Sequence, residues 1–318
     1  MMFSERELFV HYIANLTPVG ERGFLPPPTD LQVAPTWASL ALIGTAILLT
    51  ITAIFGVFVT KQTRSPMFIL VLLGAVAFPT FVEPLGDIIG ATWYPSDHRY
   101  IVGEFFGRPM PLFVFLFYAA GIPIITCSMY AMMRAGASAK LLIGMWALLA
   151  IPEIAAEIIA TKLNVMHYYG NNVIFGVPAS SIVQNGGFMI VIGWLMLALH
   201  PGNKRAGLWR WTLTPLVAPF GLMIYAIAAT GGSYLLIHTQ TYGPALWITT
   251  AGSVLLNIAL PLLLIYNPIV TRIRERRQPT NEELALAMLF MVPPKDDSYS
   301  AASGETAADP WKDALRTS

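Results

Sequence analysis

The chain has 318 residues, of which 55% are hydrophobic and 12% are charged, and its mean hydropathy is +0.61. A soluble domain carries about a quarter charged residues, so this composition excludes an ordinary water-soluble domain. The formal net charge of +1 at pH 7 gives no basis for nucleic-acid binding. The single cysteine, Cys127, excludes an internal disulfide framework.

Residues 1–36 are expected to form an extracytoplasmic lead-in. The apolar run from Leu8 to Leu16 is short, and no small-residue cleavage site follows it, which is unlike a cleaved signal peptide. Four prolines between Phe24 and Pro35 favour an extended conformation up to the first long apolar run.

Apolar runs long enough to cross a bilayer dominate residues 37–266. A transmembrane helix needs about 20 consecutive apolar residues. The sequence therefore predicts an all-α membrane protein, a bundle of about seven transmembrane helices. The expected spans are Trp37–Val59, Pro66–Gly90, Pro111–Met133, Lys140–Ala160, Ile182–Leu199, Thr212–Leu236 and Pro244–Tyr266.

The distribution of positive charge predicts the orientation of these spans in the cell membrane. Cytoplasmic loops carry an excess of Lys and Arg. One side has eleven such residues: Lys61, Arg64, Arg134, Lys140, Lys204, Arg205, Arg210, Arg272, Arg274, Arg276 and Arg277. The other side has five: Arg6, Arg22, Arg99, Arg108 and Lys162. We therefore expect the N-terminus outside and the C-terminus in the cytoplasm, which agrees with an odd number of spans.

Residues 267–318 are expected to form a basic juxtamembrane segment and a largely disordered cytoplasmic tail. Thr280 and Glu283 have the spacing of a capping box, which predicts a short helix from Asn281 to Met291. One apolar face of this helix would rest on the membrane surface or on the bundle. Prolines, Ser, Gly and Asp after it favour disorder.

Four carboxylates interrupt two of the apolar runs. Glu83 and Asp87 fall late in the second span, and Glu153 and Glu157 fall late in the fourth. Each pair has i, i+4 spacing and shares a helix face. Ionisable residues within a membrane are costly and usually face a cavity or the bundle interior. We therefore interpret all four as candidate catalytic residues, with solvation at the outer interface as the alternative for Asp87 and Glu157.

The two acidic segments resemble each other at an offset of 70 residues, Glu83-Pro-Leu-Gly-Asp87-Ile-Ile against Glu153-Ile-Ala-Ala-Glu157-Ile-Ile. A parallel duplication and chance similarity both explain this match. Aromatic and polar residues follow each pair, and a further amide lies near the start of the fifth span. We predict these residues as substrate contacts: Trp93, Tyr94, His98, His167, Tyr168, Tyr169 and Asn185. The alternatives are an interfacial belt for Trp93, solvation for the histidines and helix–helix contact for Asn185.

Two short motifs resemble the AveC-type spirocyclase family of actinobacterial membrane proteins. They are Glu83-Pro84-Leu85 followed by Tyr94-Pro95, and Glu157 followed by Tyr168-Tyr169-Gly170. The resemblance implies closure of a spiroketal from a dihydroxy-ketone, with loss of water in some members, in the maturation of polyketides. It covers most of the membrane region but not the tail.

The residues suit such acid–base chemistry. One carboxyl group kept neutral by burial would donate a proton, and a charged neighbour would stabilise the cation that forms. A cyclase or dehydratase that acts on a hydrophobic polyketide- or isoprenoid-like substrate is therefore our first hypothesis. We expect no cofactor, because no Rossmann or P-loop signature is present, and no metal, because no HExxH spacing is present. A proton-coupled transporter of a lipophilic molecule is the main alternative, and a seven-span binding or sensory protein is another.

The topology leads to the first testable prediction. Reporter fusions should place the N-terminus outside and the segment from Arg272 to Arg277 inside, because eleven positive residues face five across the membrane. Fusions that report both ends on the same side would contradict a seven-span arrangement.

Overall fold

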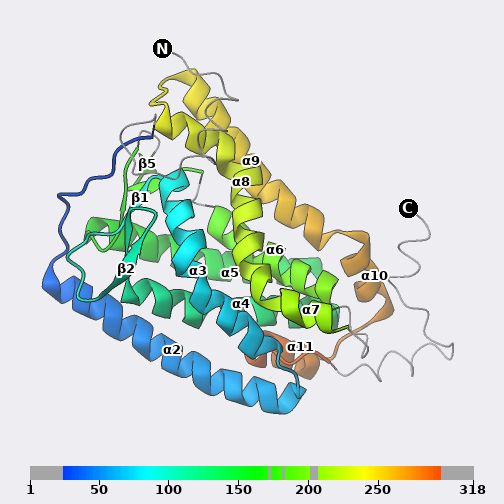
Figure 1. Cartoon of the computed structure of the whole chain (residues 1–318). Helices are drawn as coiled ribbons and strands as arrows, with labels where there is room; N and C mark the ends of the chain where they lie inside the picture. The colour runs from blue at the N-terminus through cyan, green and yellow to red at the C-terminus, as the bar shows by residue number, and fades with distance from the viewer. Residues whose placement is uncertain (1–23, 171–172, 181–182, 201–206, 295–318) are drawn as a thin grey trace.

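A computed structural model describes residues 24–170, 173–180, 183–200 and 207–294 as a bundle of α-helices (Figure 1). Within these described residues, six helical segments are long and apolar enough to cross a membrane. They are α2 (Pro35–Thr63), α3 (Met67–Gly90), α4 (Leu112–Ala135), α5 (Ala139–Lys162), the continuous segment Leu208–His238 and α9 (Pro244–Ile265). The segment Leu208–His238 comprises α7 (Leu208–Leu213), the 3₁₀ turn η1 (Thr214–Leu216) and α8 (Val217–His238). The prediction of an all-α membrane protein is confirmed.

A seventh apolar helix, α6 (Gln184–Leu199), is shorter than the others at 16 residues. At 1.5 Å per residue it is about 24 Å long, less than the ~30 Å of a bilayer core. More than half of its residues are buried, and it packs against α4, α5, α8 and α9. Because neighbouring helices shield it, α6 does not need the length of a lipid-facing helix. It corresponds to the fifth predicted span, and the other six predicted spans agree with helices to within a few residues.

Short strands gather at one end of the bundle, and α7, α10 (Pro268–Arg276) and α11 (Asn281–Phe290) lie at the opposite end (Figure 1). The strands form three antiparallel pairs among the described residues: β1 with β4, β2 with β3, and β5 with β6. Their bounds are β1 Thr92–Trp93, β2 Ile101–Phe105, β3 Arg108–Pro111, β4 His167–Tyr168, β5 Val173–Ile174 and β6 Val177–Pro178. The acidic segments of α3 and α5 both lead into the strand end.

The central helix of the packing is α4, which contacts α2, α3, α6 and α11. Its Met129, Met132 and Met133 are fully buried, because flexible thioether side chains fill irregular gaps between helices. By contrast, α2 exposes Ile47 and Ile54 on its outer face. Apolar side chains exposed on long apolar helices are expected where a bundle faces lipid.

Glycine allows α6 and α4 to approach closely. A Cβ atom added at Gly193 would overlap the side chain of Met129 and lie 3.2 Å from its carbonyl carbon. At Gly44 on α2, by contrast, an added Cβ would meet nothing within 4 Å. These two glycines therefore differ in packing although both lie within apolar helices.

The C-terminal helix α11 has the predicted capping box: Thr280 Oγ1 accepts a hydrogen bond from the Glu283 N–H, and the Glu283 carboxylate accepts one from the Thr280 N–H. The hydrogen bond that Ser128 on α4 donates to the Met288 carbonyl (3.1 Å) places this helix against the bundle. Of the two predicted resting places, the structure shows the bundle. The expected disorder after Pro294 concerns residues 295–318, which lie outside the described part of the chain.

Substituting Gly193 tests this packing. Gly193→Ala should lower the stability of the detergent-solubilised protein by about 1–3 kcal/mol, because the added methyl group forces α6 and α4 apart. Gly44→Ala should leave it unchanged or slightly raised, since alanine favours the helix and meets no neighbour. Thermal unfolding followed by circular dichroism measures both, and equal behaviour of the two variants would contradict the close contact.

Candidate functional site

The two acidic pairs lie on neighbouring faces of one cavity. Glu83 and Asp87 are one turn apart on α3, and Glu153 and Glu157 are one turn apart on α5. All four side chains line a cavity of about 380 Å³ inside the bundle. This volume lies within the usual range of about 300–1,000 Å³ for small-molecule sites. The structure thus brings together all four predicted carboxylates.

Six helices supply the cavity wall, namely α2, α3, α4, α5, α6 and α8, and most of that wall is apolar. Its larger apolar side chains are Phe78, Val82, Ile89, Phe113, Val114, Phe117, Val165, Met166, Phe188, Leu222, Met223 and Ile227. Such a wall suits a hydrophobic molecule, and the carboxyl groups form its polar part.

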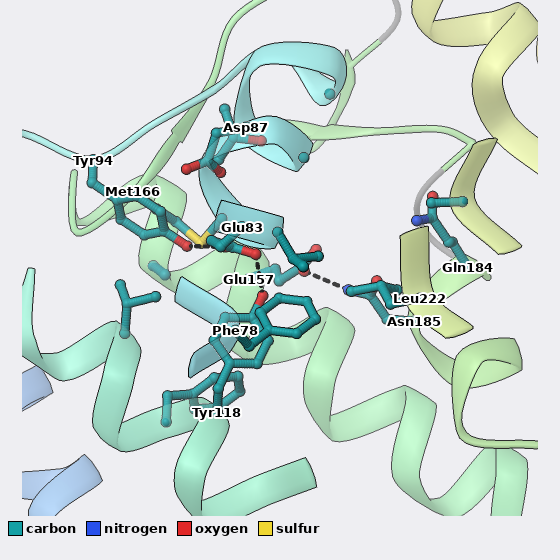
Figure 2. A pocket seen from close by; sticks show the side chains of 18 of the residues that line it. Phe78, Glu83, Asp87, Tyr94, Tyr118, Glu157, Met166, Gln184, Asn185 and Leu222 are labelled. Carbon is teal, nitrogen blue, oxygen red and sulfur yellow. Dashed lines mark hydrogen bonds between the residues drawn. The ribbon is translucent and has the colours of Figure 1, made fainter. Parts of the chain in front are cut away.

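Two tyrosines hold Glu83. The Tyr94 hydroxyl donates to Glu83 Oε1 at 2.9 Å, and the Tyr118 hydroxyl donates to Oε2 at 2.5 Å (Figure 2). Burial raises the pKa of Tyr94 well above its ordinary value, and the charge of Glu83 raises it further, so this phenol keeps its proton. Both oxygens of Glu83 are therefore supplied with donors.

In the described part of the chain, only one of the two carboxyl oxygens of Glu157 accepts a hydrogen bond. Asn185 Nδ2 donates to Glu157 Oε1 at 2.6 Å (Figure 2), and the Tyr168 hydroxyl lies within electrostatic reach of this carboxyl group. Burial raises the pKa of Tyr168 well above its ordinary value, and the charge of Glu157 adds to this, so Tyr168 keeps its proton. Glu157 Oε2 is buried without a hydrogen-bond partner among the described residues.

Two further carboxyl oxygens of described residues that line the cavity are also buried without a hydrogen-bond partner. Glu153 Oε2 and Asp87 Oδ2 are both buried, and neither has a hydrogen-bond partner within the described part of the chain. The Asp87 side chain is only 3% exposed. Because buried polar atoms are normally satisfied, these oxygens mark places where a ligand group is expected.

The segments that follow the two acidic pairs are joined across the end of the cavity. β1 pairs with β4, so that Thr92 lies opposite Tyr168 and Trp93 lies opposite His167. The Tyr169 N–H extends this pairing by donating to the Ala91 carbonyl at 2.8 Å. The pairing fixes the exits of α3 and α5 relative to each other, and thereby the two acidic pairs.

Strand alternation divides the predicted substrate contacts into two groups. Successive side chains on a strand point to opposite faces. Tyr94 and Tyr168 line the cavity together with Asn185 from α6. The other four predicted contacts do not line it: Trp93, His98, His167 and Tyr169.

These four residues lie in the cap formed by the strands and loops. The rings of Trp93 and Tyr169 flank the guanidinium group of Arg108, with its central carbon 5.4 and 5.6 Å from the two ring centroids. His98 Nε2–H donates to the Val165 carbonyl at 2.8 Å. Burial lowers the pKa of His98 and of His167, which favours their neutral forms.

The sequence did not predict that Arg108 lies near the site, and this residue was counted only among the positive charges of the outer loops. This side chain is 1% exposed and donates to the Thr92 carbonyl (3.2 Å) and the Tyr169 hydroxyl (2.5 Å). It also lies within electrostatic reach of Asp87, although it makes no direct ion pair with it. No described Lys or Arg lines the cavity, and the partial counter-charge comes instead from Arg108 of the β2–β3 hairpin.

The polar residues Tyr118, Gln184 and Tyr234 also line the cavity, and of these Tyr118 and Gln184 were not predicted. Gln184 Oε1 accepts hydrogen bonds from Tyr234 (2.7 Å) and Thr230 (3.0 Å), which links α6 to α8. A tyrosine or glutamine inside an otherwise apolar span is the sequence signal that points to them. Among the described residues, no group of three or more His, Cys, Asp or Glu side chains is placed to hold a metal ion.

The comparisons with known proteins add no relative. No protein-family model, curated protein or solved structure matches this chain. The function is therefore inferred from the residues that line the cavity.

The cap depends on the buried guanidinium group. Arg108→Gln should lower stability by about 2 kcal/mol or more, because it removes charge-assisted hydrogen bonds and leaves their buried acceptors unpaired. Arg99→Gln is the matched control: this exposed side chain donates to Ser39, and its loss should change stability by less than about 1 kcal/mol. Thermal unfolding in detergent measures both, and equal stability of the two variants would contradict a structural role for Arg108.

Proposed function

We propose that this membrane protein is an acid–base catalyst of the cyclase or dehydratase type. It needs no cofactor in this scheme, and its substrate is a hydrophobic polyketide- or isoprenoid-like molecule that carries oxygen. The observation that supports the proposal is an apolar cavity whose four carboxyl groups have unequal surroundings. Unequal environments are how enzymes give chemically similar carboxyl groups different roles.

Glu157 is the proposed proton donor. Its Oε1 is fixed by Asn185, while its Oε2 lies in the cavity without a partner and is free to carry a proton towards a substrate. Glu153, one turn away on α5, is its helix-face partner. A second acid nearby favours sharing of one negative charge between the two, which leaves a proton available.

Glu83 is the proposed cation stabiliser. Two phenols donate to its two oxygens, which is the arrangement that favours a charged carboxylate. Asp87, its partner on α3, has the electrostatic support of Arg108. A Glu83 carboxylate held by two phenols and an acidic α5 pair across the same cavity resemble the use of two carboxyl groups around an oxocarbenium ion in glycosidases.

Closure of a spiroketal from a keto-diol illustrates the chemistry. One hydroxyl adds to the carbonyl carbon and gives a hemiketal. Glu157 protonates the hemiketal hydroxyl, which leaves as water, and the resulting oxocarbenium ion lies beside the Glu83 carboxylate. The second hydroxyl attacks this carbon, and its proton returns to Glu157, so that one water molecule is released per product.

The resemblance to AveC-type spirocyclases points to the same class of reaction, since Glu83, Tyr94, Glu157 and Tyr168 belong to the motifs that carry it. All four of these residues line the cavity, and Tyr94 donates a hydrogen bond to Glu83 there. We propose on this basis a role in secondary metabolism at the cell membrane.

Glutamine substitutions test the proposal. Both glutamine side chains keep the shape of glutamate, but Glu157→Gln removes the proton donor and Glu83→Gln removes the negative charge that stabilises the cation. Each should lower kcat by about 10²–10⁴ with little change in KM. The assay gives the purified protein a keto-diol or polyene lipid in detergent and follows the product by mass spectrometry. Loss of water in the product separates spirocyclisation and dehydration from simple cyclisation.

Glu104→Gln is the matched control, because Glu104 is exposed on β2, outside the cavity, and its loss should leave turnover unchanged. Full activity of the Glu83→Gln, Glu157→Gln double variant would contradict the proposal. Proton-dependent uptake into proteoliposomes without conversion would favour the transporter instead. Lipid profiling of a strain that lacks the protein identifies the substrate to assay.

A further inference from the structure

The cavity contains more acidic than basic groups. Four carboxyl groups line it, and its lining contains no Lys, Arg or His side chain. Even when Arg108, which lies behind Asp87, is counted, three carboxyl groups lack a basic counterpart at the site. A low-dielectric cavity of this kind favours a positively charged ligand group.

The unpartnered carboxyl oxygens require a ligand group that donates hydrogen bonds. Asp87 Oδ2, Glu153 Oε2 and Glu157 Oε2 are hydrogen-bond acceptors when ionised, and each is buried without a partner in the described structure. Asp87 is only 3% exposed, so its unpartnered oxygen lies well inside the protein. An ammonium group brings up to three donors and no acceptor, which matches a site of unsatisfied acceptors.

Aromatic rings form much of the remaining wall. They come from α3, α4, α6, α8 and the cap: Phe78, Tyr94, Phe113, Phe117, Tyr118, Tyr168, Phe188 and Tyr234. The face of an aromatic ring attracts a cation, and the attraction is stronger where water is excluded. The same rings provide apolar contact for a hydrocarbon body.

We propose that this cavity is a binding site for hydrophobic ammonium compounds, with the ammonium group at the Asp87, Glu153 and Glu157 oxygens and the apolar body against the aromatic wall. This inference goes beyond the proposed reaction, because binding makes or breaks no covalent bond. It holds for a protein that converts such a compound, is inhibited by it or carries it.

A pair of compounds with the same shape tests the charge requirement. Isothermal titration calorimetry at pH 7 compares 1-aminoadamantane, which carries an ammonium group, with the neutral 1-adamantanol on purified protein in detergent. The wild type should bind the amine about tenfold or more tightly than the alcohol, the equivalent of one charge-assisted contact. Equal affinity for the two compounds, or no amine binding, would overturn the proposal.

Variants assign the selectivity to the cavity. The Glu153→Gln, Glu157→Gln double variant should lose about tenfold in amine affinity and keep its affinity for the alcohol, while Glu104→Gln should change neither. Asp87→Asn provides a second test should the double variant not fold. Unchanged amine affinity in a folded cavity variant would contradict the site. A protein that binds the amine selectively but converts no keto-diol would contradict the proposed reaction alone.

Discussion

Removing a carboxyl group from water costs several kcal/mol unless it is protonated or hydrogen-bonded, and this bundle encloses four of them in one cavity. The structure meets that cost with donors from distant segments. Tyr94 and Tyr118 donate hydrogen bonds to Glu83, Asn185 donates one to Glu157, and Arg108 acts electrostatically on Asp87 from the outer hairpin. The pairing of β1 with β4 contributes to this arrangement, because it joins the segments that carry Tyr94 and Tyr168 at the end of the cavity.

The donors are distributed unequally, and this inequality gives the cavity its chemical character. On α3, both oxygens of Glu83 are satisfied, whereas on α5 one oxygen of Glu153 and one of Glu157 are not. A molecule that enters the cavity therefore meets Glu83 oxygens that already accept hydrogen bonds, and unsatisfied oxygens on Asp87, Glu153 and Glu157. The proposed proton transfer uses Glu157, whereas the proposed binding of an ammonium group uses all three unsatisfied oxygens.

Apolar runs predicted the helices well because length and hydropathy are local properties of the chain. The acids were also predictable, since four carboxylates inside such runs have few structural explanations. The residues that interact with these acids were harder to predict, because they are distant in sequence. Tyr118 lies 35 residues from Glu83, and Arg108 lies sixteen residues beyond Thr92. Tyr94, Tyr168 and Asn185 were found because they follow the acids or lie in a span. Trp93, His167 and Tyr169 were grouped with them because a sequence does not say which residues of a two-residue strand face the cavity.

The central claim is that the four acids line one largely apolar cavity inside the bundle, and reagent access tests it most directly. The purified protein is treated in parallel with a hydrophobic carbodiimide, N,N′-dicyclohexylcarbodiimide, and with a water-soluble carbodiimide, and modified carboxyl groups are mapped by mass spectrometry. The account predicts that the hydrophobic reagent modifies Glu153 and Glu157, and that the water-soluble reagent modifies exposed Glu104 but leaves these two intact. Modification of Glu153 and Glu157 by the water-soluble reagent as fast as Glu104 would contradict it.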